Sequence, residues 1–164
     1  MKNKINKNKL TKINLAYIAG FLDGDGSILA QLVKNDSYIY KFQIRLSIVF
    51  YQKTTKHWIL LWLKKKLKYG FIRKKINGMS EYCIVSSEPV YLILLKLKPY
   101  IKLKKKLLKL ILKIIKHKKE IKSIEDFINV CKLVDLTSTL TYSKKRKIIT
   151  EYVKNYINKD TVET

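Results

Sequence analysis

Residues 18–26 read Ile18-Ala19-Gly20-Phe21-Leu22-Asp23-Gly24-Asp25-Gly26, so two carboxylates separated by a single glycine follow directly on an apolar segment. The apolar residues predict a short helix over 15–22, which the glycines at 24 and 26 would end. Asp25 would then lie just past the helix C-terminus, where partial negative charge gathers. A carboxylate there is poorly placed for stability and well placed to hold a divalent cation.

Lysine dominates the charge balance of this 164-residue chain. It holds 36 Lys and Arg residues against 12 Asp and Glu, a formal net charge of +24. A compact domain with so much like charge repels itself unless a polyanion neutralises it. DNA or RNA is therefore the first candidate partner, and an anionic membrane surface is the second. A cation site beside so many lysines points to phosphate chemistry.

The composition argues against several other classes of protein. Cys83 and Cys131 form no CxxC pair and the two histidines are isolated, which disfavours a structural zinc site or a disulfide framework and favours a reducing compartment. The first residues lack the apolar region of a secretory signal. No apolar run reaches the ~18 residues that a membrane span needs. We therefore expect a soluble protein without a membrane partner.

The order of predicted elements defines the fold class. Helix, strand, strand, helix, strand, strand and helix follow one another, and three more helices come after them. This order predicts an α+β fold in which helices cover one face of a four-stranded antiparallel sheet. We expect a basic arm over 1–13, one domain over 14–158 and a tail over 159–164. The helices are expected at 15–22, 54–66, 88–98, 103–117, 124–133 and 143–157, and the strands at 27–33, 42–51, 71–76 and 81–86.

Residue patterns support individual elements. Residues 42–51 alternate with period two, which is typical of a half-buried strand. Asn77-Gly78 predicts a hairpin between two strands. In the helix over 54–66, the spacing of Trp58, Leu61, Trp62 and Leu67 predicts one apolar face. The outward positions of the sheet form a polar, basic face that can line a DNA major groove, although an ordinary solvated face would look the same. This face includes Gln31, Gln43, Arg45, Arg73, Lys75 and Glu81.

The motif, its place before a strand and the element order resemble the LAGLIDADG homing endonucleases, in particular their single-motif, homodimeric, intron-encoded group. The similarity runs from about 15 to 157. It includes Gly-Asp-Gly-Ser at 24–27, Gln-Lys-Thr at 52–54 with Trp58, and Pro-Tyr-Ile-Lys-Leu-Lys at 99–104. The resemblance implies an αββαββα core with a saddle-shaped DNA-binding sheet and C-terminal helices. One copy of the motif implies a homodimer.

The resemblance also assigns the chemistry. It implies that Asp25 is a direct ligand of Mg²⁺, assisted by the Gly24 carbonyl oxygen. Mn²⁺ is expected to replace Mg²⁺, and Ca²⁺ to bind without supporting cleavage. Gln52, Lys56 and Lys104 match the family's outer catalytic positions, which act on solvent and on developing phosphate charge. The alternative is that residues 23–26 form only a polar turn. An EF-hand calcium loop fits these residues less well, because it needs further ligands.

Small residues in the first helix suggest how two copies would meet. Ala16, Ala19 and Gly20 recur at i, i+3 and i+4, so two helices can pack backbone to backbone. Asp23, the family's less catalytic acidic position, is assigned to the same interface. The alternative is that these residues pack beneath the sheet of their own subunit.

The remaining candidates are expected to contact DNA. Arg73 and Lys75 can donate to guanine, and Gln31 or Gln43 can pair with adenine. Outward apolar positions read little beyond thymine methyl groups, and for every one of these residues the alternative is a solvated surface. The other members of the set are Leu29, Val33, Asn35, Ser37, Tyr38, Arg45, Val49, Glu81 and Cys83.

Together these features predict a homodimeric, Mg²⁺-dependent endonuclease that cuts a long pseudo-palindromic double-stranded DNA site. The resemblance implies 3′ overhangs and intron homing in a chloroplast or mitochondrion. The alternative is a maturase, an RNA-binding splicing cofactor for a group I intron, and a third class is a non-catalytic basic DNA-binding protein. The lysine-flanked helix over 103–117 is also typical of membrane-surface helices, although a core helix with a basic outer face explains it better.

Overall fold

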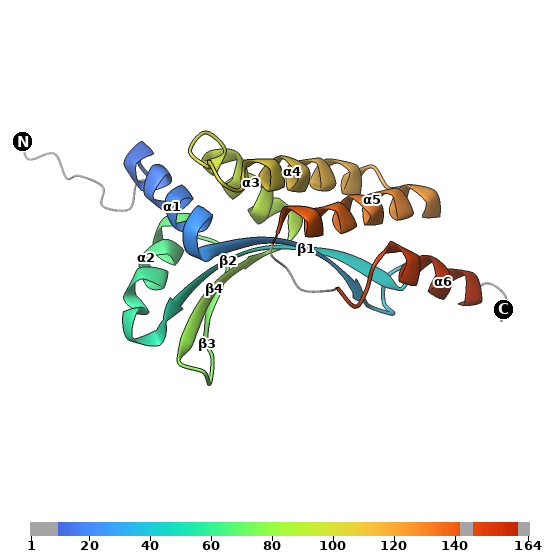
Figure 1. The fold of residues 1–164 in the computed structure, drawn as a ribbon, viewed down its shortest axis with the longest axis horizontal. Coiled ribbons are helices and arrows are strands. Elements are labelled where there is room, and N and C mark those ends of the chain that lie inside the picture. The colour runs from blue at the N-terminus through green and yellow to red at the C-terminus, as the bar shows by residue number, and fades with distance from the viewer. Residues whose placement is uncertain (1–9, 142–145, 161–164) are drawn as a thin grey trace, which may run out of the picture. The chain divides into compact units, whose positions relative to one another are not determined.

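The structure, a computed structural model, describes residues 10–141 and 146–160 (Figure 1). The chain forms two compact units: the first comprises Met1–Ser27 and Ile48–Leu103, and the second Ile28–Ser47 and Lys104–Thr164. The elements are α1 (Lys12–Asp25), β1 (Gly26–Lys34), β2 (Phe42–Lys53), the 3₁₀ turn η1 (Thr54–Lys56), α2 (Trp58–Leu67), β3 (Phe71–Lys74), β4 (Met79–Val85), α3 (Ser87–Leu97), α4 (Lys105–Lys119), α5 (Ile124–Leu136), the 3₁₀ turn η2 (Thr137–Leu140) and α6 (Thr150–Asp160).

The four strands form one antiparallel sheet in the order β1-β2-β4-β3, which confirms the predicted α+β class. In the β3–β4 hairpin, Arg73 pairs with Glu81. Its turn is closed by the Lys75 amide, which donates to the Met79 carbonyl at 2.7 Å. Gly78 takes a positive φ of 75°, a conformation that glycine adopts without steric cost. The hairpin predicted from Asn77-Gly78 is therefore present.

Helix α1 is longer than predicted at both ends. Thr11 caps its start through a reciprocal pair of hydrogen bonds with Asn14, so the helix begins at Lys12. At its other end the helix continues through Gly24 and includes Asp25, and Gly26 leaves it in an extended conformation. A side chain at Gly26 would clash with Leu22, whereas Gly24 has open space around it. Asp25 thus lies in the last helical turn and not beyond it.

The core of the first unit is built on aromatic contacts from β2. The ring of Phe50 lies 5.9 Å from that of Tyr82 on β4 and 5.6 Å from that of Phe21 on α1. The predicted apolar face of α2 was wrong in part, because Trp58 and Leu61 are 65% and 53% exposed. The helix begins only at Trp58, after η1, and it turns a different stripe toward β3 and β4. That buried stripe consists of Ile59, Leu60, Leu63 and Leu67.

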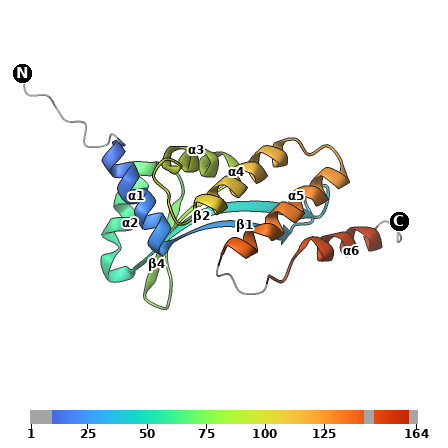
Figure 2. The same ribbon diagram turned by 45° about the horizontal axis from the view of Figure 1, so that its top comes forward.

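In the second unit, α4 packs on α5 and α5 packs on α6 (Figure 2). The predicted helix over 143–157 begins later, at Thr150, because the Asp135 carboxylate accepts the Thr150 amide at 2.8 Å. Arg146 is not helical; its guanidinium donates to the Val134 carbonyl at the end of α5. Residues 143–145 of that prediction lie outside the described residues.

The predicted boundaries of the two terminal segments differ from the ends of the described helices α1 and α6. The expected arm over 1–13 loses Lys12 and Ile13 to α1, and α6 extends to Asp160, inside the expected tail. Residues 1–9 and 161–164 lie outside the described part of the chain. Within that part, no helix has the length and apolar character needed to cross a bilayer.

Gly70 provides a test of the α2–β3 connection. Its φ is +80°, and an added Cβ would lie 2.2 Å from the Cys83 carbonyl oxygen. Gly70→Ala should therefore lower the free energy of unfolding by more than the ~1–2 kcal/mol that left-handed strain alone costs. Urea unfolding measures this. The control is Gly78→Ala, where φ is +75° but no atom lies within 4 Å. Equal losses of unfolding free energy in the two variants would contradict the close packing of Gly70 against the Cys83 carbonyl.

Candidate active site and nucleic-acid interface

Asp25 presents an exposed carboxylate at the C-terminal end of α1, next to exposed Gly24. Carbonyl groups in a last helical turn lack intrahelical partners and carry partial negative charge. No basic residue lies in this turn to offset that charge. Carboxylate and carbonyl oxygens gathered in this way suit a hard divalent cation.

Asp23, two residues earlier, has a different environment. Its Oδ2 accepts the backbone amides of Lys102 at 2.6 Å and Leu103 at 3.0 Å. Hydrogen bonds from amides to a carboxylate are among the stronger ones in proteins. Asp23 therefore anchors the segment that leads into Lys104 and α4. This contact lies within one chain, so Asp23 is engaged before any second copy is present.

Gln52 and Lys56 lie at the junction between β2 and α2. Lys56 is exposed in η1, and the half-buried Gln52 side chain accepts the Lys53 amide at 3.0 Å. Two contacts to Ser80 of β4 hold this junction: Thr54 Oγ1 lies 3.0 Å and His57 Nδ1 3.2 Å from Ser80 Oγ. Ser80 is fully buried, which rules it out as an accessible nucleophile. Its positioning role was missed, because a serine within a strand carries no sequence signal.

Lys104 stands at the N-cap of α4 and is half-buried. Its carbonyl accepts the Leu108 amide at 2.8 Å, which begins the helical hydrogen bonding of α4. It directly follows Leu103, whose amide Asp23 holds. Its backbone is therefore fixed on both sides.

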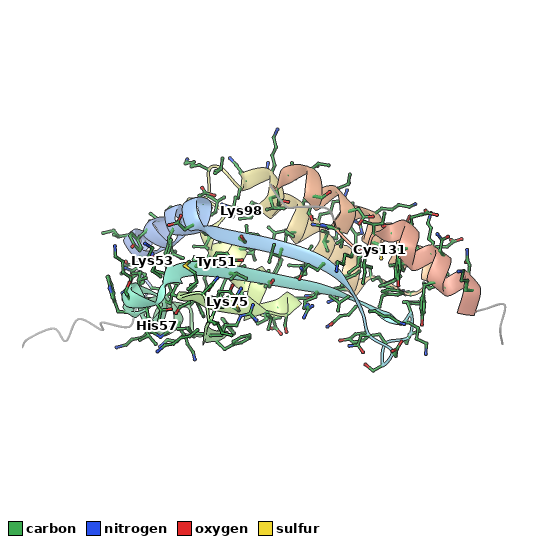
Figure 3. All side chains as sticks on the ribbon, turned by 60° about the horizontal axis from the view of Figure 1, so that its bottom comes forward. Tyr51, Lys53, His57, Lys75, Lys98 and Cys131 are labelled. Atoms are coloured by element: carbon green, nitrogen blue, oxygen red, sulfur yellow. The ribbon has the colours of Figure 1, made fainter. Side chains whose placement is uncertain are left out.

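The exposed Arg73 and Lys75 both pair with Glu81 (Figure 3 labels Lys75). Arg73 Nε donates to Glu81 Oε2 at 2.6 Å, while the Glu81 side chain is only 3% exposed. Burial by itself would raise the pKa of Glu81, but the hydrogen bonds and charges of Lys75 and Arg73 outweigh it and lower that pKa. Glu81 therefore fixes both cations in place and remains charged.

Three predicted DNA contacts are buried. Glu81, Cys83 and Val49 are 3%, 4% and 6% exposed, so they do not form the outward, solvated positions that alternation predicted. Glu81 is covered by the two cations that it binds, and Cys83 Sγ lies 4.0 Å from Glu81 Oε2. Burial raises the pKa of Cys83. Period-two alternation identifies the face of a strand, but it does not reveal when long neighbouring side chains cover that face.

In the second unit, the predicted DNA contacts lie on β1, β2 and the loop between them. Gln31 and Arg45 are exposed, whereas Leu29, Val33 and Gln43 are half-buried. The loop brings two candidates together, since Gln43 Nε2 donates to Tyr38 Oη at 2.9 Å. Asn35 Oδ1 accepts both the amide and the hydroxyl of Ser37, which keeps the loop compact.

The predicted interface residues of α1 divide between its two faces. Ala16 and Gly20 are exposed, but Ala19 is fully buried in its own chain, which corrects its assignment to an interface. Ile13 and Tyr17, which are 81% and 54% exposed, lie beside Ala16 and Gly20. Sequence reasoning missed these two residues. The available signal was a second apolar stripe at i, i+3, i+4 and i+7, formed by Ile13, Ala16, Tyr17 and Gly20.

Comparison with known proteins identifies the family. A family model described as LAGLIDADG endonuclease matches residues 18–111, from the motif in α1 into α4. The chain belongs to the LAGLIDADG endonuclease family. It is accordingly an endonuclease, a hydrolase of phosphodiester bonds.

Two relatives cover nearly the whole chain. DNA endonuclease I-CvuI from Chlorella vulgaris is 40% identical over 148 residues, which are 90% of this chain and 92% of I-CvuI. I-CreI from Chlamydomonas reinhardtii is 40% identical over 147 residues, 89% of this chain and 90% of its own. The crystal structure of I-CvuI with uncleaved I-CreI target DNA and Mg superposes with a TM-score of 0.85, covering 90% of this chain and 94% of that one.

The ion pairs of Glu81 with Arg73 and Lys75 predict that the stability of the fold depends on pH. Because the folded-state pKa of Glu81 is lowered, its contribution is present above the unfolded pKa of about 4.5 and is lost as pH falls below it. Glu81→Gln should cost about 1–3 kcal/mol at neutral pH, where it leaves two cations without their anion. Thermal unfolding across pH should show the difference from wild type shrinking below pH ~4.5. The control is Glu88→Gln on exposed Glu88. A stability difference between wild type and Glu81→Gln that stays constant with pH would contradict the ionised state of Glu81.

Proposed function

We propose that this chain is a homodimeric, Mg²⁺-dependent homing endonuclease that cuts one long, nearly palindromic double-stranded DNA site and leaves 3′ overhangs. We propose intron homing in a chloroplast or mitochondrion as its biological role. One observation carries the proposal: the family motif ends in an exposed carboxylate, Asp25, beside the carbonyls of a helix C-terminus. The relatives I-CvuI and I-CreI are named DNA endonucleases, and I-CvuI has been crystallised with DNA.

The donors at the end of α1 fit a divalent cation. Mg²⁺ prefers hard oxygen ligands, and proteins hold it through one or two carboxylates together with water and substrate phosphates. Asp25 and the Gly24 carbonyl would hold it here. A bound Mg²⁺ would neutralise charge on the scissile phosphate and activate water. We expect Mn²⁺ to substitute, and Ca²⁺ to bind without supporting cleavage.

A single chain supplies only part of such a site. Within residues 10–141 and 146–160, no three His, Cys, Asp or Glu side chains gather where a metal could bind. The exposed stripe Ile13, Ala16, Tyr17 and Gly20 runs along α1 toward Gly24 and Asp25. Packing this stripe against its copy would bring two Asp25 carboxylates to one two-fold axis. A two-fold dimer in turn favours a nearly palindromic target.

The remaining residues are proposed to act on the phosphate and on the bases. Lys56 and Lys104 would stabilise charge that develops on the phosphate, and Gln52 would orient solvent. Arg73 and Lys75, oriented by Glu81, would donate to guanine edges, and Gln31 and Gln43 would contact adenine. Group I intron RNA is a further proposed partner, because the same basic protein would attract its phosphates.

The catalytic role of Asp25 is tested by Asp25→Asn. Cleaved sites are first selected from a randomised duplex library with wild-type protein in Mg²⁺. On the selected site, the variant should lose about 10²–10³-fold in cleavage rate, the cost of removing one preorganised electrostatic group from an active site. A footprinting assay should show that the variant still binds DNA. Its stability should not fall, because the substitution removes a carboxylate from a helix C-terminus. Glu88→Gln serves as the control. Wild-type cleavage by Asp25→Asn would overturn the proposed mechanism.

The dimer is tested by Gly20→Leu. A Cβ at Gly20 meets no atom within 4 Å, and leucine favours helix more than glycine does, so the isolated chain should keep its fold. The leucine would nevertheless hold two α1 helices apart. Analytical ultracentrifugation should show a monomer, and cleavage should fall with dimerisation. Asn155→Leu, at an exposed position on α6, is the control. A Gly20→Leu variant that remained dimeric and active would exclude this interface.

A further inference from the structure

The outer face of α4 carries a row of lysines that the proposed active site does not use. Five exposed lysines lie between the start of α4 and His117: Lys105, Lys106, Lys109, Lys113 and Lys116. We call these five the α4 lysine face. The opposite face of the helix is buried in the second unit through Leu107, Leu108, Ile111, Ile114 and Ile115. Among the described residues, none of the five lysines takes part in a salt bridge.

This arrangement costs stability when nothing is bound to it. Lys105 and Lys109, and Lys109 and Lys113, are i,i+4 neighbours, while Lys113 and Lys116 are i,i+3 neighbours. Like charges at these spacings destabilise a helix by about 0.2–0.5 kcal/mol per pair. From Lys105 to Lys119 the helix contains no Asp or Glu. A bound polyanion would remove the repulsion.

Within the second unit, the α4 lysine face lies away from the polar side of the strands. Phe42 packs on Tyr152 and Tyr156 of α6, and Lys118 of α4 donates to the Ile44 carbonyl at 2.8 Å. The alternating residues Gln43 and Arg45 therefore face the other side. Figure 3 views this unit with the strands in front of α4 and α5. A duplex lying against Gln43 and Arg45 would not reach the lysines of α4.

We propose that the α4 lysine face is a second, sequence-independent binding surface for duplex DNA, so that one protein can hold two DNA segments. Helix α4 is about 17 Å long over these lysines, a length of duplex that carries about 10 phosphates. Binding through lysine alone reads charge and not sequence. The inference rests on the proposed function only in that the first of the two DNA segments binds to the sheet.

Duplex DNA fits this surface better than other polyanions do. Residues 105–119 contain no Phe, Tyr or Trp, whereas proteins that bind single strands stack bases on such aromatic rings. A membrane-surface helix must insert its apolar face into lipid, but here that face is buried against the rest of the second unit. What remains exposed is a row of ammonium groups suited to a phosphate backbone.

The test measures bridging between two DNA segments. Donor-labelled and acceptor-labelled duplexes of arbitrary sequence are mixed with the full chain in EDTA, and energy transfer reports bridging. Lys109→Gln, Lys113→Gln and Lys116→Gln are combined in one variant, because glutamine keeps helix propensity. The matched control combines Lys64→Gln, Lys65→Gln and Lys96→Gln, at exposed lysines of α2 and α3, with the same loss of charge.

We expect wild type and control to bridge duplexes, and the α4 variant to need about tenfold more protein for the same bridging. The slope of log binding constant against log salt concentration should be smaller by up to about three for the α4 variant. The α4 variant should still cleave a selected target at close to the wild-type rate. Equal bridging by both triple variants would overturn the proposal, as would stronger competition by single-stranded RNA or anionic vesicles than by unlabelled duplex. Bridging in EDTA needs no cleavage, so loss of the proposed endonuclease activity would appear separately.

Discussion

The contact between the Asp23 carboxylate and the amides of Lys102 and Leu103 organises the first unit. It joins the end of α1 to a segment about 80 residues later in the chain. Asp25, two positions further on, remains exposed. The two acids of the motif therefore differ in environment: one stabilises the fold and the other is available for a ligand. A helix that continues through Asp25 explains the difference, because successive helical positions point to different sides.

Other acidic side chains also bind neighbouring amides or cations and so stabilise the fold. The sequence has 12 acidic against 36 basic residues, and several of the acids hold structural positions. Glu81 orients Arg73 and Lys75 on the β3–β4 hairpin. Asp135 accepts the first amide of α6, and Asp126 caps α5 through its capping box with Ser123. On α4, by contrast, none of the five lysines of the α4 lysine face takes part in a salt bridge among the described residues, and this is the basis for the proposed second nucleic-acid surface.

Local rules predicted the elements well where local chemistry determines them. The Asn77-Gly78 hairpin and the alternation of Phe42, Ile44 and Ile48 were predicted correctly, because turn geometry and strand period are properties of short segments. The face of α2 was not, since Trp58 and Ile59 are both apolar and only the packing against β3 and β4 selects between them. The start of α6 was missed because its amide is capped by Asp135 from another helix.

The sequence by itself determined the family and the α+β order of elements, and it predicted a polyanionic partner and a catalytic role for Asp25. Motif residues and net charge are local or additive quantities, so they can be read without coordinates. Tertiary structure alone decided that Ala19 is buried while Gly20 is exposed, and that Val49, Cys83 and Glu81 are covered. It also decided that Asp23 binds backbone amides far along the chain. Burial and long-range hydrogen bonds depend on which surfaces meet, and neither residue type nor spacing specifies that.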